Sequence, residues 1–218
     1  MEQLLMRLYS ITPVRMLSNG KSRLSSVLSP SQREHLSKAM LSDVLSKIQS
    51  SKITKGMLVV SPDQEVIKIA SDFGAHGIKE EAEHGVNAAV EKGIEYALKN
   101  RADSIVVLPA DLPRLNIEDL VSLVAAVEED PTVVMTPSNR LDGTNALLMK
   151  PPAVMNLHYD QDSFRSHVLE AIEQNVRLKT VLRNGLMSDL DDQTDLTEYL
   201  RSDSVSEVKK YLLSIGLP

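Results

Sequence analysis

Short apolar runs alternate along the chain with longer stretches of helical periodicity. The runs of strand length lie at residues 8–14, 57–61, 104–110, 133–136, 146–149 and 178–182. The run at 104–110, Ser-Ile-Val-Val-Leu-Pro-Ala, is rich in β-branched residues and has no polar alternation, as expected for a strand buried on both faces. The alternation predicts an α/β fold with a mostly parallel central sheet and helices on both faces.

The segments between these runs carry helix start and stop signals. Ser29, Pro30 and Gln32 form a capping box with proline in the first turn, and apolar residues then recur every four positions from 36 to 48. Further helices are expected at residues 64–73, ended by Gly74, at 86–98, and at 120–127, opened by Asn116.

The domain organisation follows from length and composition. A chain of 218 residues with 42% apolar side chains can bury one sizeable core, and no repeat or Pro/Gly/Ser linker divides it. We expect residues 1–218 to form one domain, with a helical tail at about 194–218. In such a sheet, ligands bind beyond the carboxyl ends of the strands, so the informative residues should follow strands.

Composition and charge exclude several classes of function. The net charge of −6 and the aromatic content of 3% argue against nucleic-acid binding. Cysteine is absent, which excludes disulfides and thiolate metal sites and suits a cytoplasmic protein. No stretch approaches the roughly 18 apolar residues of a membrane span, and residues 1–8 do not resemble a leader. The histidines lack metal-ligand spacing, and Gly-x-Ser-x-Gly and Gly-x-Gly-x-x-Gly motifs are missing.

The loop after the first predicted strand concentrates positive charge. Arg15, Lys21 and Arg23 fall within nine residues, around a small Ser-Asn-Gly segment. Gly20-Lys21-Ser22 is not a P-loop, because that motif needs a glycine where Arg15 stands. The cations and backbone amides of this loop are suited to a triphosphate. A solvated basic loop is the alternative.

Two acidic segments are candidate metal ligands. Asp111 follows the most apolar run directly, where a carboxylate is costly unless it is hydrogen-bonded or bound to a cation. Asp189 and Asp191 stand on alternate positions, so in an extended chain both face the same way. If the two segments meet, their acids can share one Mg²⁺. The alternatives are a proline-bounded turn at 111 and an acidic turn before the last helices.

Two polar loops complete the candidates. Gly85 and Asn87 precede a predicted helix, where glycine permits close backbone approach and asparagine offers a donor and an acceptor to a base. Thr144 and Asn145 open a predicted strand and present a hydroxyl and an amide. Either loop could equally be a plain turn or helix cap.

Taken in order, these motifs resemble a known family. They are Pro-Val-Arg with Lys-Ser-Arg-Leu, Gly-Val-Asn, Leu-Pro-Ala-Asp-Leu-Pro, Gly-Thr-Asn-Ala-Leu-Leu, Asp-Ser-Phe-Arg-Ser-His and Asp-Leu-Asp. From residue 8 to about 200 the chain resembles the 2-phospho-L-lactate guanylyltransferases, relatives of the molybdenum-cofactor guanylyltransferases. The resemblance implies a Rossmann-like nucleotidyltransferase fold, GTP as substrate, Mg²⁺, a homodimer and a role in making coenzyme F-420.

The resemblance also implies roles for individual residues. Lys21, Arg23 and Asp111 would be catalytic, and Asp111 and Asp191 would hold Mg²⁺. The implied nucleotide-binding residues are Pro13, Val14, Arg15, Lys21, Gly85, Asn87, Pro109 and Ala110, and those for the phosphorylated acid are Thr144, Asn145, Asp160 and Ser163.

The implied reaction joins GMP from GTP to 2-phospho-L-lactate, giving lactyl-2-diphospho-5'-guanosine and pyrophosphate. Phosphoenolpyruvate, phosphoglycerate or a pterin are alternative acceptors, and a non-catalytic nucleotide-binding domain is the alternative from another class. The chain departs from relatives in three places: it has Arg15 for a common lysine, Tyr-Asp-Gln-Asp at 159–162 for a glycine-rich segment, and Asp192-Gln193 for Thr-Pro.

Overall fold

The sheet is the centre of the fold. The computed structural model describes residues 6–217, and within them seven strands form one sheet in the order β3-β2-β1-β4-β6-β5-β7. Among these strands only β6 runs against its neighbours, β4 and β5, which confirms a mostly parallel sheet. The strands are β1 (Leu8–Pro13), β2 (Gly56–Ser61), β3 (His76–Lys79), β4 (Ser104–Val107), β5 (Thr132–Pro137), β6 (Thr144–Lys150) and β7 (Arg177–Thr180).

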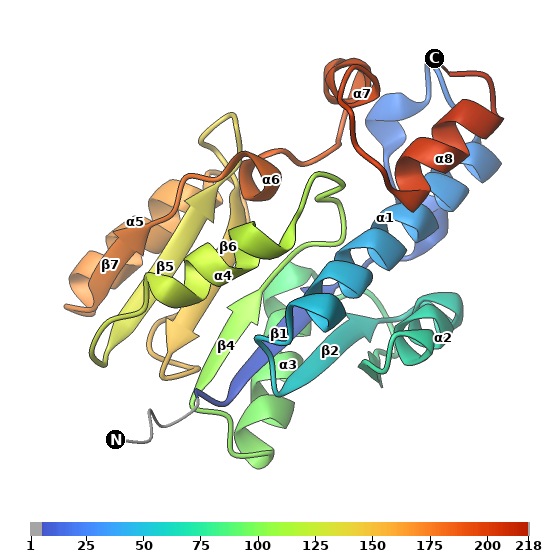
Figure 1. The fold of residues 1–218 in the computed structure, drawn as a ribbon. Helices are drawn as coiled ribbons and strands as arrows, with labels where there is room; N and C mark the ends of the chain where they lie inside the picture. Colours follow the sequence, from blue (N-terminus) through green and yellow to red (C-terminus); the bar gives the residue numbers. More distant parts are fainter. Residues whose placement is uncertain (1–5, 218) are drawn as a thin grey trace.

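Helices cover both faces, as predicted. In Figure 1, α1 and α4 lie in front of the sheet, and α3 lies behind it. The core on the α1 side also takes in α2, and the core on the α3 side takes in α5. The helices are α1 (Pro30–Ser51), α2 (Gln64–Asp72), α3 (Val86–Lys99), α4 (Ile117–Ala125), α5 (Ser163–Glu173), α6 (Asn184–Met187), α7 (Gln193–Leu200) and α8 (Glu207–Ser214), with short 3-10 turns η1 (Leu17–Asn19) and η2 (Ser22–Leu24).

The cap signals read from the sequence are confirmed. The Ser29 hydroxyl accepts from the Gln32 backbone N–H at 3.3 Å, and the Gln32 side chain accepts from the Ser29 N–H at 2.8 Å. Asn116 and Asp119 form the same reciprocal pair at the start of α4. Each such cap stabilises its helix by about 1 kcal/mol.

Strand boundaries and two elements differ from the prediction. The strand expected at 104–110 ends at Val107, because Pro109 has no N–H to donate to a ladder. The edge strand β3 was missed, since His-Gly-Ile-Lys contains a single large apolar residue. Helix α5 was also missed, and the last strand lies one to two residues earlier than expected.

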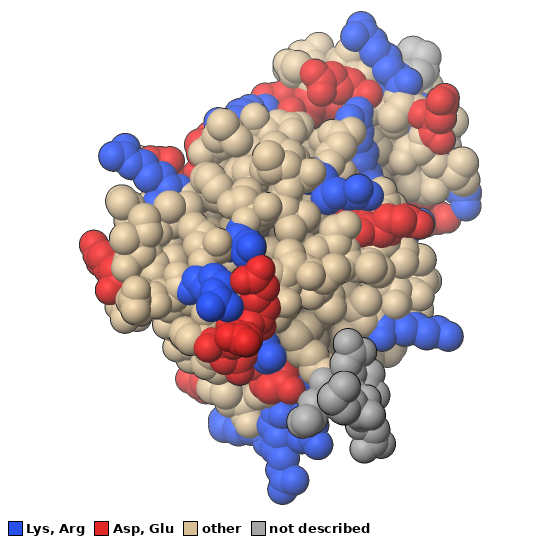
Figure 2. Space-filling view, turned by 60° about the vertical axis from the view of Figure 1, so that its left-hand side comes forward, with Lys and Arg blue, Asp and Glu red and all other residues tan. Residues whose placement is uncertain are grey.

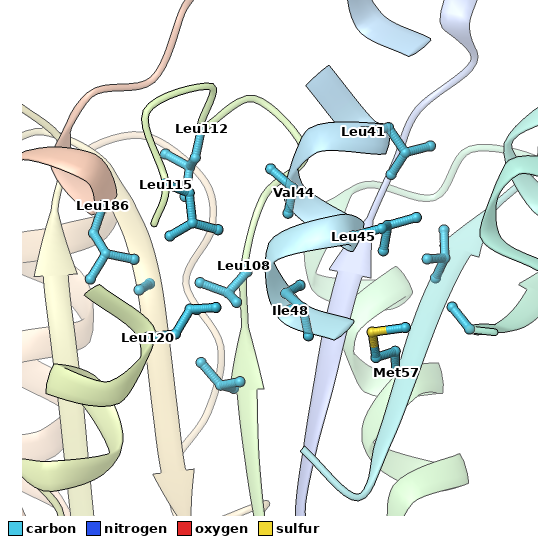
Figure 3. Close-up of a cluster of buried hydrophobic side chains, with 14 of the residues drawn as sticks. Leu41, Val44, Leu45, Ile48, Met57, Leu108, Leu112, Leu115, Leu120 and Leu186 are labelled. Atoms are coloured by element: carbon cyan, nitrogen blue, oxygen red, sulfur yellow. The ribbon is translucent and has the colours of Figure 1, made fainter. Parts of the chain in front are cut away.

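One core cluster anchors the loop that follows β4. Leu108, Leu112 and Leu115 pack with Val44 and Ile48 of α1 (Figure 3). The first three are at most 3% exposed, so the segment that carries residues 109–111 is fixed by apolar side chains before and after it. This rigid attachment holds the polar residues between them at the edge of the sheet.

The last helices pack back onto α1 (Figure 1). Buried residues of α7 and α8 meet η2, the segment after it and the first half of α1: Leu24, Leu28, Leu36, Met40, Leu196, Tyr199, Val208 and Leu212. The Asp43 carboxylate accepts the first two N–H groups of α8, each at 3.0 Å. The helices expected in this part of the chain therefore brace the loop between β1 and α1.

The surface carries both signs of charge. On the face drawn in Figure 2, basic and acidic side chains lie interspersed among uncharged residues. Surface ion pairs such as Lys179 with Glu128, at 2.8 Å, join neighbouring elements. Among the helices of residues 6–217, none combines the length and the apolar character needed to cross a membrane.

Candidate active site

A large cavity opens where the predicted strand ends meet. Its volume is about 570 Å³, within the range of small-ligand sites. Strands β1 and β4 reach it with their carboxyl ends, and the antiparallel β6 reaches it with its first residue, Thr144. The predicted site residues that line it are Pro13, Val14, Arg15, Lys21, Arg23, Pro109, Ala110, Asp111, Thr144, Asn145, Asp160, Ser163 and Asp191.

Lys21 joins two acids that are distant in the sequence. Its Nζ donates to Asp111 Oδ2 at 2.6 Å and to Asp191 Oδ1 at 2.7 Å. The two carboxylate oxygens therefore lie within two hydrogen-bond lengths of each other. The lysine side chain is 9% exposed, whereas those of Asp111 and Asp191 are 28% and 35% exposed. The acids consequently form the open side of this cluster.

The backbone sets up this convergence. The Leu190 N–H donates to the Asp111 carbonyl at 3.0 Å, which ties the two acidic segments together. The Asp191 N–H donates to Asp195 Oδ2 at 2.9 Å, and Asp192 caps α7. Arg140 pairs with both Asp192 and Asp195. The departure Asp192-Gln193 thus starts a helix and leaves Asp191 facing the cavity.

Charge pairing dominates the protonation of the cluster. Burial alone would lower the pKa of Lys21, but the charges of Asp111 and Asp191, with their hydrogen bonds, raise it above its ordinary value. Burial would raise the pKa of Asp191, but the charges of Lys21, Arg23 and Arg140, with the hydrogen bond from Lys21, together lower it. The pairing thus favours a charged Lys21 next to an ionised Asp191.

The loop that carries Lys21 is held in a defined conformation. Its Met16 N–H donates to Glu83 Oε1 at 2.7 Å, and its Leu17 N–H donates to Asp63 Oδ2 at 3.1 Å. Lys21 itself has a left-handed backbone, with φ of 54°. Arg15 and Arg23 are exposed at the cavity, and Arg23 Nη1 lies 3.8 Å from Asp191 Oδ2. Lys21 therefore lies between the two acids, and Arg23 lies beside Asp191.

The acid pair fits a small divalent cation. It already holds one positive group, its carboxylates face the cavity, and Mg²⁺ in proteins commonly takes one or two carboxylates with phosphate and water oxygens as its other ligands. Within residues 6–217, no group of three or more His, Asp or Glu side chains is arranged to hold a metal without help. A metal held here would need oxygens from a substrate.

A smaller cavity of about 210 Å³ adjoins the large one and shares Pro13, Val14, Arg15 and Val86 with it. Gly85 lines it at the start of α3 with φ of 88°, and a Cβ there would meet nothing within 4 Å. Glu80 also lines it, with a side chain 4% exposed and Oε1 at 3.0 Å from Lys92 Nζ.

Asn87 lies outside both cavities. Its Oδ1 accepts from the Tyr159 N–H at 2.8 Å, and its Nδ2 donates to Asp160 Oδ2 at 3.4 Å. Asn87 thus fixes the turn at 159–160 against α3.

At the far end of the large cavity, the Thr144 and Ser163 hydroxyls bond to neutral groups, and Asp160 also lines the cavity. The Thr144 hydroxyl lies 2.9 Å from His167 Nδ1, and the Ser163 hydroxyl accepts from the Thr144 N–H at 2.9 Å. Thr144 and Ser163 are 6% and 5% exposed, and His167 is fully buried. The ring of Tyr159 packs edge-on against His167, with centroids 4.9 Å apart. This end therefore presents the Thr144 and Ser163 hydroxyls next to the buried ring of His167.

Asn145 links the two ends. Its Nδ2 donates to Asp189 Oδ1 at 3.1 Å and to the Met187 carbonyl at 3.1 Å. Burial raises the pKa of Asp189, and the hydrogen bond from Asn145 partly opposes that shift. Asp189 lines the cavity beside Asp191, as expected for alternate residues of an extended segment.

Sequence reasoning assigned no role to His167, Glu80 or Tyr159. A signal existed for His167, because Ser163 and His167 are four residues apart and share one face of a helix. No such signal marked Glu80, which follows the missed strand β3. The roles predicted for the other site residues stay predictions, although the structure brings all but Asn87 to the two cavities.

Comparisons with known proteins agree on one family. A family model described as guanylyl transferase CofC like matches residues 8–218. The chain is 36% identical over 200 residues to the phosphoenolpyruvate guanylyltransferase of Rubrobacter xylanophilus, covering 92% of this chain and 97% of that protein. It is 31% identical over 207 residues to the 2-phospho-L-lactate guanylyltransferase of Methanothermobacter thermautotrophicus, covering 95% and 90%.

A further relative and a solved structure extend the comparison. The 3-phospho-D-glycerate guanylyltransferase of Colwellia psychrerythraea is 30% identical over 207 residues, covering 94% of this chain and 98% of that protein. The solved structure of a nucleotidyl transferase from Methanothermobacter thermautotrophicus superposes with a TM-score of 0.64 at 13% identity, covering 95% and 99%. The expected nucleotidyltransferase fold is thereby confirmed.

Proposed function

The chain belongs to the family of CofC-like guanylyl transferases, and from this premise we propose that it joins GMP from GTP to a three-carbon acid phosphorylated at C2. The observation that carries the proposal is the convergence of Asp111 and Asp191 on Lys21 at the mouth of a cavity whose other end offers hydroxyls. One end suits a nucleotide triphosphate and its metal. The other suits a small anion.

The reaction must bring two anions together. An oxygen of the acceptor phosphate attacks the α-phosphorus of GTP, the bond from that phosphorus to the bridging oxygen breaks, and pyrophosphate leaves with that oxygen. The acceptor phosphate is already ionised, so no general base is required. Positioning and neutralisation of charge supply most of the catalysis in such a step.

The cationic loop neutralises the triphosphate. Arg15 and Arg23 are exposed at the cavity and attract the phosphates by their charge. Lys21 keeps a positive charge beside Asp111 and Asp191. Asp111 and Asp191 would hold Mg²⁺, and a metal bound there would supply positive charge next to the phosphates. In this proposal Lys21 and Arg23 also stabilise the departing pyrophosphate.

The smaller cavity is proposed to take the guanine base. Guanine presents two adjacent donors, N1–H and the 2-amino group, and a carboxylate accepts both. Glu80 is the buried carboxylate of this cavity. Gly85 leaves open space at the start of α3, so that the base can approach the backbone.

The acceptor is proposed to bind between Thr144 and Ser163, at the start of α5. The first candidate is 2-phospho-L-lactate, a substrate in coenzyme F-420 biosynthesis. Phosphoenolpyruvate is the second candidate, favoured by the 36% identity to the enzyme of Rubrobacter xylanophilus. The two acids share one heavy-atom skeleton and one charge pattern, and differ only in saturation between C2 and C3.

The test is an acceptor series with the purified protein. GTP and Mg²⁺ are mixed with 2-phospho-L-lactate, phosphoenolpyruvate or 3-phospho-D-glycerate, and pyrophosphate release is measured with mass spectrometry of the diphosphate product. We expect equal amounts of pyrophosphate and guanylylated acid with a C2-phosphorylated acid. Pyrophosphate without an adduct, or no turnover with any acid, would overturn the proposal.

A further inference from the structure

His167 is a fully buried histidine at the neutral end of the cavity, and its tautomer can be read from its neighbours. Its Nε2 lies 2.9 Å from the His158 backbone nitrogen, which can only donate. Nε2 must therefore be an unprotonated acceptor, and the neutral ring carries its hydrogen on Nδ1. Burial lowers the pKa of His167 to about 4, as does nearby His158, so the ring stays neutral at physiological pH.

The tautomer fixes the role of the next hydroxyl. Because Nδ1 carries the hydrogen, it is the donor toward Thr144 Oγ1, 2.9 Å away, and toward the Ser163 backbone carbonyl. Thr144 Oγ1 is then the acceptor in this hydrogen bond, and its own hydroxyl hydrogen is not used in it. In the opposite tautomer, with the hydrogen on Nε2, Nδ1 would accept and the Thr144 hydroxyl would have to donate to it.

A count of hydrogens shows what is left for a ligand. The Thr144 and Ser163 hydroxyls lie 3.4 Å apart, and Ser163 Oγ already accepts from the Thr144 N–H. The pair has two hydroxyl hydrogens and room for only one bond between them. At least one O–H group is therefore free to donate, and both residues line the cavity.

We propose that His167 is a positioning residue, which holds the Thr144 and Ser163 hydroxyls as hydrogen-bond donors toward an anionic oxygen of the acceptor acid. The proposal rests on the acceptor site of the proposed function. The His158 N–H donates to the imidazole, and the imidazole donates to Thr144. This chain of hydrogen bonds orients the hydroxyl donors without adding a charged group to the site. His167 itself does not touch the substrate.

Two substitutions separate the two nitrogens of the ring. The amide of His167→Asn reaches the position of Nδ1 and can still donate to Thr144, whereas the amide of His167→Gln reaches the position of Nε2 and can accept only from His158. We expect His167→Gln to raise the KM for the acceptor about tenfold, the size of one lost hydrogen bond to a charged group. The KM for GTP should stay within twofold, and His167→Asn should lie closer to wild type.

A double-mutant cycle removes the ambiguity of folding. Thr144→Val should raise the acceptor KM about tenfold, since it deletes the donor. If His167 acts through Thr144, His167→Gln added to Thr144→Val should change the acceptor KM no further. His158→Gln is the matched control, because its backbone N–H is retained and glutamine can still donate to Glu170. Additive effects in the cycle would overturn the proposal.

The tautomer can be measured without any activity. In ¹⁵N NMR of the whole protein, the His167 resonances, assigned by their loss in His167→Gln, should show a protonated Nδ1 and an unprotonated Nε2 at pH 7. An Nε2–H tautomer or an imidazolium would overturn the positioning role even if guanylyl transfer occurs. Absence of turnover in the wild type with the expected tautomer would instead count against the proposed function.

Discussion

The two ends of the cavity, to which we assign the nucleotide and the acceptor, differ in how they are built. At the nucleotide end, Asp111, Asp191 and Lys21 form a charged, partly exposed cluster with Arg23 beside it. At the acceptor end, Thr144 is almost buried and its polar contacts are neutral. Attraction between charges acts over a distance and depends little on the shape of the ligand. A buried hydroxyl stabilises only a ligand that offers a hydrogen-bond partner at the right position.

This contrast gives each end a separate task. The relatives described above share guanylyl transfer in their names and differ in the acid. A charged end that serves the triphosphate is expected to be common to them. The end with the two hydroxyls is expected to select the acid, because one misplaced hydrogen-bond donor there would weaken binding of the acceptor.

We expect the largest effect on activity from Asp111→Asn, at the charged end of the cavity. We expect it to lower kcat by at least about a hundredfold, the scale of losing one preorganised electrostatic group. The fold should persist, because Leu108 and Leu112 still anchor the loop. Stopped assays of GMP transfer measure the effect, with the exposed residue Asp72→Asn as the control. Turnover near that of the wild type would remove Asp111 from the reaction.

Lys21→Ala tests whether the cation of the cluster serves the nucleotide. Calorimetric titration should show the Kd for GTP raised about tenfold, the loss of one charge-assisted contact. Lys52→Ala is a matched control, since Lys52 also has a left-handed backbone, with φ of 55°. An unchanged Kd for GTP would leave Lys21 a purely structural ion-pair partner.

Glu80→Gln tests the base end. We expect kcat/KM for GTP to fall about tenfold and that for ITP, which lacks the 2-amino group, to fall less, because glutamine keeps only one acceptor. The neighbouring exposed residue Glu81→Gln should change neither. Equal losses for both nucleotides would show that Glu80 supports the fold and does not read guanine.

The smallest effect concerns stability at the neutral end. The pKa of His167 falls from 6.5 to about 4 on folding, so below pH 6.5 the unfolded chain binds a proton that the folded chain refuses. This contribution to stability is present at neutral pH and is lost as pH falls. Denaturant unfolding should show about 1 kcal/mol more loss between pH 7 and pH 5.5 in the wild type than in His167→Gln. Parallel curves would mean that the folded protein accepts the proton.

Much of the scaffold was predictable from local signals. The apolar positions 36 to 48 of α1, its Ser29 cap and the Asn116 cap are encoded by neighbouring residues. The edge strand β3 and helix α5 were not, because their formation depends on packing against distant elements. Likewise Pro109 ended β4 sooner than its apolar run indicated.

The candidate site divides in the same way. Asp111 could be picked out because parallel strands bring their carboxyl ends together and a carboxylate there is costly unless it is paired. Thr144 opens the antiparallel β6, and its candidate role came from the family resemblance. The contact of Lys21 with both acids joins residues 90 and 170 positions apart and has no local signature. The orientation of His167 depends on a backbone N–H nine residues away, which no residue type specifies.

In the proposed reaction, Asp111 and Asp191 converge on one divalent cation beside the triphosphate. The most direct measurement is a crystal structure of the protein soaked with Mn²⁺ and GTP, with anomalous scattering used to locate the metal. We expect one anomalous peak in contact with both carboxylates and with phosphate oxygens of GTP. A metal peak away from both residues, with GTP ordered in the cavity, would contradict this expectation.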